Sequence, residues 1–186
     1  MSNIQMVDLK SQYLKIKDEI NKEVLETISS TKYINGPKVV EFKNNLQKYM
    51  DCKYVIPCAN GTDALQIALM SLDLNPGDEV ICPSFTYVAT AEVVALLGLK
   101  PVMADVNEKT FNIEAKNIKP LINSKTKVIV PVHLFGQSAE MEEIMNLAKE
   151  FGLYVIEDNA QAIGSRYIFS DGNVKNTGTI GHIETT

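Results

Sequence analysis

The sequence predicts an α/β fold of three layers, α/β/α, in which helices cover both faces of a mainly parallel sheet. Short apolar runs alternate along the chain with longer stretches of helical periodicity, which is the pattern of successive β-α units. The segment from Lys127 to Leu134 is almost continuously apolar, as expected for a strand covered on both faces. At 186 residues the chain is long enough for one such core, so a single domain is the simplest expectation.

Two amphipathic helices are predicted within residues 1–51. Apolar residues recur at three- and four-residue steps from Leu9 to Val24 and again from Val39 to Tyr49. The tripeptide Asn35-Gly36-Pro37 separates the two patterns, because glycine can end a helix and proline suits the first turn of the next one.

Residues 52–165 are predicted to form the α/β core, and residues 166–186 a hairpin-like, incomplete tail. The tail is predicted from the turn-rich sequence over residues 169–173. The predicted strands are 54–56, 79–82, 101–104, 128–132 and 153–156, and the predicted helices are about 62–73, 86–98, 113–122 and 139–151.

The composition excludes several classes of protein. A net charge of -5 argues against nucleic-acid binding through a broad basic surface. No stretch approaches the roughly 20 apolar residues of a membrane span, so we expect no membrane partner and a cytoplasmic location. Cys52, Cys58 and Cys82 lack metal-ligand spacing, and we interpret them as reduced, structural residues.

Candidate functional residues follow the predicted strands, where ligand sites of parallel sheets gather. Gly61 and Thr62 stand where a helix begins, and free amides there can cradle a phosphate; an ordinary helix cap is the alternative. Aromatic side chains around Phe85 and Tyr87 open the next helix. One of them could stack on a flat cofactor, or they could simply pack in the core.

Two acids, Glu157 and Asp158, end the strand predicted at 153–156. A carboxylate there could pair with the N–H of a pyridine ring and keep that ring protonated. A metal site is disfavoured, because neither His133 nor His182 has ligand spacing to Asp158, and we assign no metal ligands. A purely structural pair of acids remains the alternative.

Taken together, these segments resemble the DegT/DnrJ/StrS family of sugar aminotransferases, which have the type I (aspartate aminotransferase) fold of enzymes that use pyridoxal 5'-phosphate (PLP). The resemblance spans essentially the whole chain. It is carried by Val7-Asp8-Leu9-Lys10, Tyr33-Ile34-Asn35-Gly36-Pro37, Asn60-Gly61-Thr62-Asp63-Ala64-Leu65, Pro76-Gly77-Asp78-Glu79-Val80, Pro83-Ser84-Phe85-Thr86-Tyr87-Val88-Ala89-Thr90, Pro131-Val132-His133-Leu134-Phe135-Gly136 and Glu157-Asp158-Asn159-Ala160-Gln161-Ala162.

The resemblance implies a role in PLP binding for five residues. Gly61 and Thr62 would hold the cofactor phosphate and Tyr87 would stack on the ring. Asp158 would bind the ring nitrogen and Gln161 the ring hydroxyl.

The resemblance also implies a Schiff-base lysine a few residues beyond the segment that corresponds to Gly181–Thr186. We therefore expect the chain to be the N-terminal portion of the PLP-binding large domain, truncated before the lysine, so the resemblance does not imply activity of the chain alone. Glu184 stands where the family pattern has glycine.

The function that the resemblance implies is transfer of an amino group, with glutamate as the expected donor, to a keto-sugar nucleotide used for surface polysaccharide or O-antigen. Members that act on 3-keto substrates such as UDP-N-acetyl-3-keto-glucuronate are the most similar by eye. A homodimer is expected, because family active sites form between subunits. The alternatives are a PLP-dependent sugar dehydratase, with histidine in place of the lysine, and a folded but non-catalytic remnant.

Overall fold

The computed structural model describes residues 7–186, so the masked start of the chain, residues 1–6, lies outside this description. The chain forms two compact units, one that ends at Leu46 and one over Gln47–Thr186. The second unit contains all the strands of the described residues.

The two leading helices are present as predicted. Pro37 is the first residue of the second helix, where its fixed φ is already helical and its missing N–H costs nothing. Gly36 precedes it, and no other residue fits there, because a Cβ would lie 2.0 Å from the backbone oxygen of Lys32. The helices are α1 (Leu9–Ser30) and α2 (Pro37–Met50).

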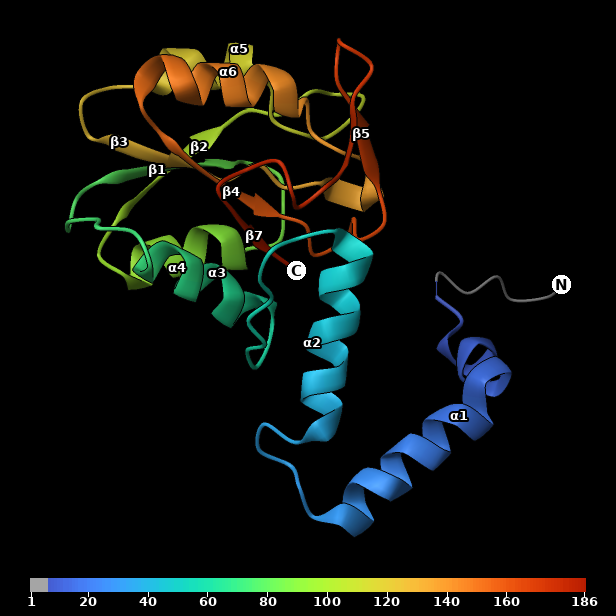
Figure 1. Ribbon diagram of the computed structural model, residues 1–186. Coiled ribbons are helices and arrows are strands. Elements are labelled where there is room, and N and C mark those ends of the chain that lie inside the picture. The colour runs from blue at the N-terminus through green and yellow to red at the C-terminus, as the bar shows by residue number, and fades with distance from the viewer. Residues whose placement is uncertain (1–6) are drawn as a thin grey trace, which may run out of the picture. The chain divides into compact units, whose positions relative to one another are not determined.

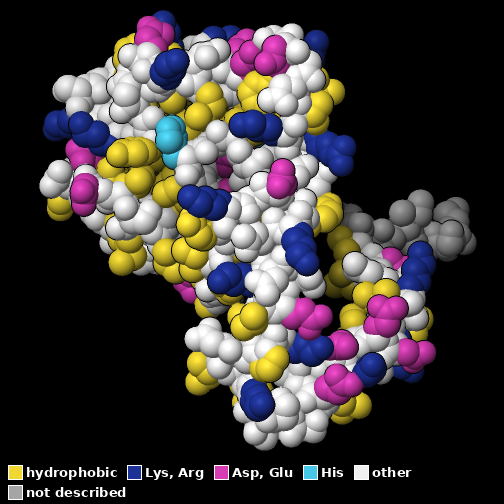
Figure 2. All heavy atoms as spheres, viewed as in Figure 1, with side chains coloured by type: hydrophobic (Ala, Val, Ile, Leu, Met, Phe, Trp, Pro, Cys, Tyr) yellow, Lys and Arg dark blue, Asp and Glu magenta, His cyan; other side chains and the backbone are white. Residues whose placement is uncertain are grey.

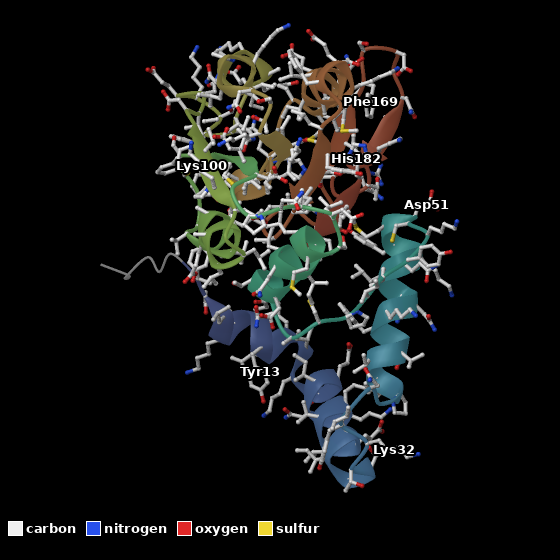
Figure 3. The ribbon with its side chains drawn as sticks, turned by 90° about the vertical axis from the view of Figure 1, so that its left-hand side faces the viewer. Tyr13, Lys32, Asp51, Lys100, Phe169 and His182 are labelled. Carbon is white, nitrogen blue, oxygen red and sulfur yellow. The ribbon has the colours of Figure 1, made fainter. Side chains whose placement is uncertain are left out.

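A five-stranded sheet forms the centre of the second unit, and all of its paired strands are parallel (Figure 1). The strand order is β2-β1-β3-β4-β7, so Lys100 in β2 and His182 beside β7 lie toward opposite edges (Figure 3). The strands are β1 (Glu79–Pro83), β2 (Lys100–Ala104), β3 (Thr126–Ile129), β4 (Tyr154–Asp158) and β7 (Ile183–Thr185), with an antiparallel hairpin of β5 (Arg166–Ile168) and β6 (Val174–Asn176).

Helices cover both faces of the sheet, which confirms the predicted three layers. In Figure 1, α3 and α4 lie on one face, and α5 and α6 on the other. The bounds are α3 (Gly61–Met70), α4 (Ala89–Leu96), α5 (Ala115–Ile118) and α6 (Met141–Phe151), with short 3₁₀ helices η1 (Lys119–Leu121) and η2 (Leu134–Gly136).

The core consists of two apolar clusters, one on each face of the sheet. Successive strand residues point to opposite faces, so Val80 packs in the cluster with α3 and α4, whereas Ile81 packs in the cluster with α5 and α6. Val128 and Ile129 divide in the same way and are both wholly buried. The near-continuous apolar run in this part of the sequence is thereby explained.

One predicted strand is wrong: residues 54–56 are irregular. Their β-branched and aromatic composition suits a strand, but a strand also needs a hydrogen-bonded neighbour, and none of the described strands pairs with them. The side chains of Tyr54 and Ile56 are 74% and 80% exposed. Apolar composition alone therefore misled the prediction.

Prolines shorten two other predicted elements. The strand predicted at 128–132 ends at Ile129, because Pro131 has no N–H for the ladder, although an isolated bridge still joins Val132 to Asp158. The helix predicted at 113–122 ends at Ile118 and continues as η1, which contains Pro120. The sequence analysis did not predict β7, whose three residues join the sheet beside β4.

No helix among the described residues is long and apolar enough to cross a membrane. On the face shown in Figure 2, Lys and Arg side chains are interspersed with Asp and Glu.

Candidate functional site

The carboxyl end of β4 carries two buried acids. Glu157 and Asp158 are successive residues of the strand, so their side chains point to opposite faces of the sheet. Glu157 is fully buried and Asp158 is 6% exposed. The two acids have different hydrogen-bond partners, and this difference separates their roles.

Asp158 has one carboxylate oxygen fixed and one nearly free. The Thr90 hydroxyl donates to Oδ2 over 2.9 Å. Within residues 7–186, the hydrogen bond that Oδ1 accepts is a long one from the Ala160 amide, at 3.4 Å. The backbone is held on both sides, because the Asp158 amide donates to Pro131 (2.9 Å) and its carbonyl accepts from His133 (3.0 Å). This part of β4 is therefore rigid.

The surroundings of Asp158 disfavour an unpaired negative charge. Burial raises the pKa of Asp158 above its usual value, although the hydrogen bonds from Thr90 and the Ala160 amide act in the opposite direction. Burial, together with the charge of Asp158, also raises the pKa of the Cys82 thiol to about 12, so this thiol stays neutral. A cationic N–H group placed at Oδ1 would be strongly favoured here.

Glu157, on the other face, has every oxygen occupied. It accepts from the amides of Gly178 (2.8 Å), Ile180 (2.7 Å) and Gly181 (2.5 Å), and its Oε2 lies 2.9 Å from His133 Nε2. Burial acts to raise the pKa of Glu157, but the hydrogen bonds from His133 and the Gly181 amide outweigh it, and the pKa falls below its usual value. Glu157 thus ties the loop before β7 to β4.

The hydrogen bonds of His133 assign its tautomer. Its Nδ1 accepts from the backbone amide of Ala139 at 3.1 Å, so the proton of the neutral ring is on Nε2. That proton is donated to Glu157, 2.9 Å away. His133 therefore supports a structural carboxylate and is buried away from solvent.

The N-terminus of α3 presents unpaired donors to open space. Asn60 caps the helix by accepting from the Asp63 amide at 2.9 Å. Among the described residues, no acceptor reaches the amides of Gly61 and Thr62. A Cβ built on Gly61 would meet no atom within 4 Å, so the space beside this residue is open. The arrangement suits a phosphate group.

Tyr87 and Gln161 are both available for contacts with a ligand. The side chain of Tyr87 is 74% exposed at the mouth of α4, three residues before Thr90. Gln161 accepts from the Phe135 amide at 2.8 Å through its Oε1. Its Nε2 is left as the donor that could reach a ring hydroxyl.

Three aromatic rings lie together in the segments that follow β1, β2 and β3, and the sequence analysis gave no role to two of them, Phe111 and Phe135. The Phe85 and Phe111 ring centroids are 5.4 Å apart, and those of Phe111 and Phe135 are 6.0 Å apart. Phe111 and Phe135 have φ of 60° and 57°, which is rare for bulky residues. The buried Asn112 accepts from the Leu134 amide at 3.1 Å and so links two of these loops.

The predicted site residues are partly brought together. Asp158 is in direct contact with α4 through Thr90, and α3, α4 and β4 contribute residues to one apolar cluster. No hydrogen bond among residues 7–186 joins Gly61 or Thr62 to Asp158 or Gln161.

Neither hollow described for the surface contains a predicted site residue. The described residues hold no group of three or more His, Cys, Asp or Glu side chains that could bind a metal ion. Of the two hollows, one, of about 430 Å³, is lined by residues 31–37, and the other, of about 350 Å³, lies between the end of α2 and the β5–β6 hairpin. The predicted site residues at the strand ends therefore line neither of these two hollows.

Known proteins are similar to this chain in sequence and in fold. The DegT/DnrJ/EryC1/StrS aminotransferase family matches residues 14–186. UDP-2-acetamido-2-deoxy-3-oxo-D-glucuronate aminotransferase of Pseudomonas aeruginosa is 48% identical over 164 residues, which are 88% of this chain and 46% of that protein. The chain spans about half the length of the curated relatives that it matches.

Solved structures agree with the sequence relatives. A DegT DnrJ EryC1 StrS aminotransferase from Brucella abortus superposes with a TM-score of 0.91 at 38% identity, covering 98% of this chain and 49% of that one. NtdA from Bacillus subtilis, solved with bound cofactor PMP, gives a TM-score of 0.82 at 36% identity, covering 88% of this chain and 38% of that one.

The mainly parallel α/β sheet with helices on both faces matches the fold of solved aminotransferases. The chain belongs to the DegT/DnrJ/EryC1/StrS aminotransferase family, as the sequence analysis predicted.

Proposed function

We propose that this chain binds PLP at the carboxyl end of β4 and forms the cofactor-binding part of an aminotransferase that acts on a keto-sugar nucleotide. The observation that carries the proposal is the Asp158 carboxylate, which is buried, held by Thr90 through Oδ2 and nearly free at Oδ1. A site that disfavours an unpaired negative charge but keeps one acceptor open suits a protonated ring nitrogen.

The chain's own residues divide the binding of PLP among them. The Gly61 and Thr62 amides, with the Thr62 hydroxyl and the dipole of α3, would hold the phosphate. The exposed ring of Tyr87 would stack on the cofactor ring. Asp158 would hold the proton of the ring nitrogen, and Gln161 Nε2 would donate to the ring hydroxyl. Bound PLP supplies an electron sink and carries the amino group between substrates.

The substrate proposal follows from the relatives. The Pseudomonas aeruginosa protein is named for a UDP sugar with a 3-oxo group, and it is 48% identical to this chain. We therefore propose a 3-keto-sugar nucleotide as acceptor and glutamate as amino donor, in the synthesis of a surface polysaccharide such as lipopolysaccharide. A homodimer and a cytoplasmic location stay predictions.

Cofactor binding is tested by titrating the chain with PLP and following ligand fluorescence, with pyridoxal as the ligand that lacks the phosphate. PLP should bind at least about tenfold more tightly, because pyridoxal leaves the donors of α3 unpaired. Asp158→Asn should weaken PLP binding by at least about tenfold as well. Asp73→Asn, at an exposed site, is the matched control and should bind normally. Equal binding of PLP and pyridoxal would contradict the phosphate assignment.

The reaction is tested with a protein that contains this chain together with the Schiff-base lysine that the family resemblance implies. That protein is incubated with PLP, glutamate and UDP-2-acetamido-2-deoxy-3-oxo-D-glucuronate, and the products are analysed by mass spectrometry. Formation of a 3-amino sugar nucleotide together with 2-oxoglutarate is the expected result. A product that has instead lost water would identify a dehydratase. No conversion of any keto-sugar nucleotide by the PLP-bound protein would contradict the proposed activity.

A further inference from the structure

Thr90 is a buried polar residue of α4, and its hydroxyl is directed at the acid of the proposed site. It lies in α4 and is 2% exposed, and Val93 and Val94 of the same helix belong to the apolar cluster that packs against the sheet. Its Oγ1 is 2.9 Å from Asp158 Oδ2, across a separation of 68 residues in the sequence. A hydroxyl in such surroundings needs a partner, and Asp158 is the partner that the fold provides.

The direction of this hydrogen bond is fixed by chemistry. An ionised carboxylate can only accept, so the Thr90 hydroxyl donates its single proton to Oδ2. This bond favours the charged form of Asp158, whereas burial favours the neutral form. Thr90 is therefore the main side chain that opposes the effect of burial on this acid.

The same bond also makes the two carboxylate oxygens unequal. Oδ2 is held by Thr90, whereas the amide of Ala160 approaches Oδ1 only to 3.4 Å. We propose that Thr90 is a positioning residue that holds the Asp158 carboxylate through Oδ2 and so leaves Oδ1 as the acceptor for the N–H of the cofactor ring. This inference rests on the proposed function and adds to it a residue outside the five assigned to PLP binding.

The rival explanation is that Thr90 only helps α4 pack against the sheet. Valine has nearly the shape of threonine but cannot donate, so Thr90→Val keeps the packing and removes the bond. Thr90→Ser keeps the hydroxyl and removes a methyl group. Thr126→Val is the matched control, because Thr126 is 3% exposed and begins β3, at the end of the strands away from Asp158.

The test compares the affinity of each variant for PLP and for its 1-deaza analogue, in which CH replaces the ring nitrogen. Thr90→Val should bind PLP about tenfold or more weakly, the size expected for one hydrogen bond to a charged group, whereas Thr90→Ser and Thr126→Val should stay within about threefold. For the deaza analogue, Thr90→Val and the unsubstituted chain should bind equally, because the contact that Thr90 supports is missing from both complexes.

Equal affinity of Thr90→Val and the unsubstituted chain for PLP would overturn this inference while leaving the proposed function intact. An equal loss for PLP and the deaza analogue would show a purely structural role and would also overturn it. If the unsubstituted chain did not bind PLP at all, the proposed function would fail and this inference with it. Should Thr90→Val not fold, Thr90→Ala removes the same donor without adding bulk, and the same comparisons apply.

Discussion

Glu157 and Asp158 are neighbours in β4, yet the two faces of the sheet treat them in opposite ways. Glu157 accepts hydrogen bonds from three backbone amides and lies beside His133, and its pKa is below the usual value. Asp158 has one short hydrogen bond, and burial raises its pKa. A carboxylate whose acceptors are all used can only hold the fold together. One that keeps an acceptor unused, in surroundings that disfavour its charge, is suited to bind a ligand.

The largest expected effect comes from breaking the saturated side. Four donors surround the Glu157 carboxylate: three backbone amides and the His133 ring. Glu157→Gln places an amide donor among these donors and removes the negative charge to which all four donate. We expect a loss of roughly 3 kcal/mol in the free energy of unfolding, measured in urea. The exposed Glu143→Gln on α6 is the control. A loss below about 1 kcal/mol would show that Glu157 does not hold the loop before β7.

The next effect concerns Glu184, a third acid, paired with Glu157 across the β4–β7 ladder. Burial and the charge of Glu157 raise the pKa of Glu184 from 4.5 to about 7, against the hydrogen bond from Asn159. Folding therefore favours its protonated form, so the stability that this form contributes is present below pH 4.5 and is lost as the pH rises from 4.5 to about 7. We expect about 1–2 kcal/mol, because the side chain is partly solvated.

Glu184→Gln should remove that contribution to the pH dependence. Urea unfolding at several pH values between 4.5 and 7 should show a flatter profile than the unsubstituted chain. Because Asp158 and Glu157 titrate in both proteins, the difference between the two profiles isolates Glu184. Parallel profiles would show that Glu184 is ionised in the folded protein.

A smaller effect on stability is expected for Asp158→Asn, which sharpens the comparison with Glu157→Gln. The asparagine oxygen can still accept from Thr90, and no buried charge remains. The free energy of unfolding without PLP should change by less than about 1 kcal/mol in either direction. A loss as large as that of Glu157→Gln would mean that both acids are structural.

The smallest effect is expected at the start of β1, where Glu79 forms an ion pair with Lys100. Lys100 Nζ lies 2.8 Å from Glu79 Oε1, but the lysine side chain is 65% exposed. Lys100→Met should therefore cost no more than about 0.5–1 kcal/mol of unfolding free energy in urea. Asn123 still donates to Glu79 at 2.6 Å in this variant. A loss above about 2 kcal/mol would show that the buried Glu79 depends on its exposed partner as strongly as Glu157 depends on its buried ones.

The parts of the fold that depend on local pattern could be predicted from the sequence. Alternation and apolar runs gave the strands near 79–82 and 153–156, and Gly36-Pro37 marked the start of α2. The strand predicted at residues 54–56 was wrong because hydrogen-bonded pairing, not composition, decides whether a strand forms. The short β7 was missed because only its neighbour β4 stabilises it.

For the candidate site, the sequence indicated which residue types gather at the strand ends, but not which of them are structural and which are free to contact a ligand. The side chains of two successive acids in a strand must point to opposite faces of the sheet. Only the structure shows that the loop amides donate hydrogen bonds to Glu157 and not to Asp158. Thr90 could not be identified, because its partner is 68 residues away. The roles assigned to Gly61, Thr62, Tyr87 and Gln161 stay predictions.

The central claim is that Asp158 holds the proton of the cofactor ring nitrogen. The most direct measurement is the ¹⁵N chemical shift of PLP labelled at that nitrogen and bound to the chain at pH 7. The account predicts a protonated nitrogen in the unsubstituted chain and an unprotonated one in Asp158→Asn. An unprotonated nitrogen in the unsubstituted chain, or the same protonated signal in both proteins, would contradict it.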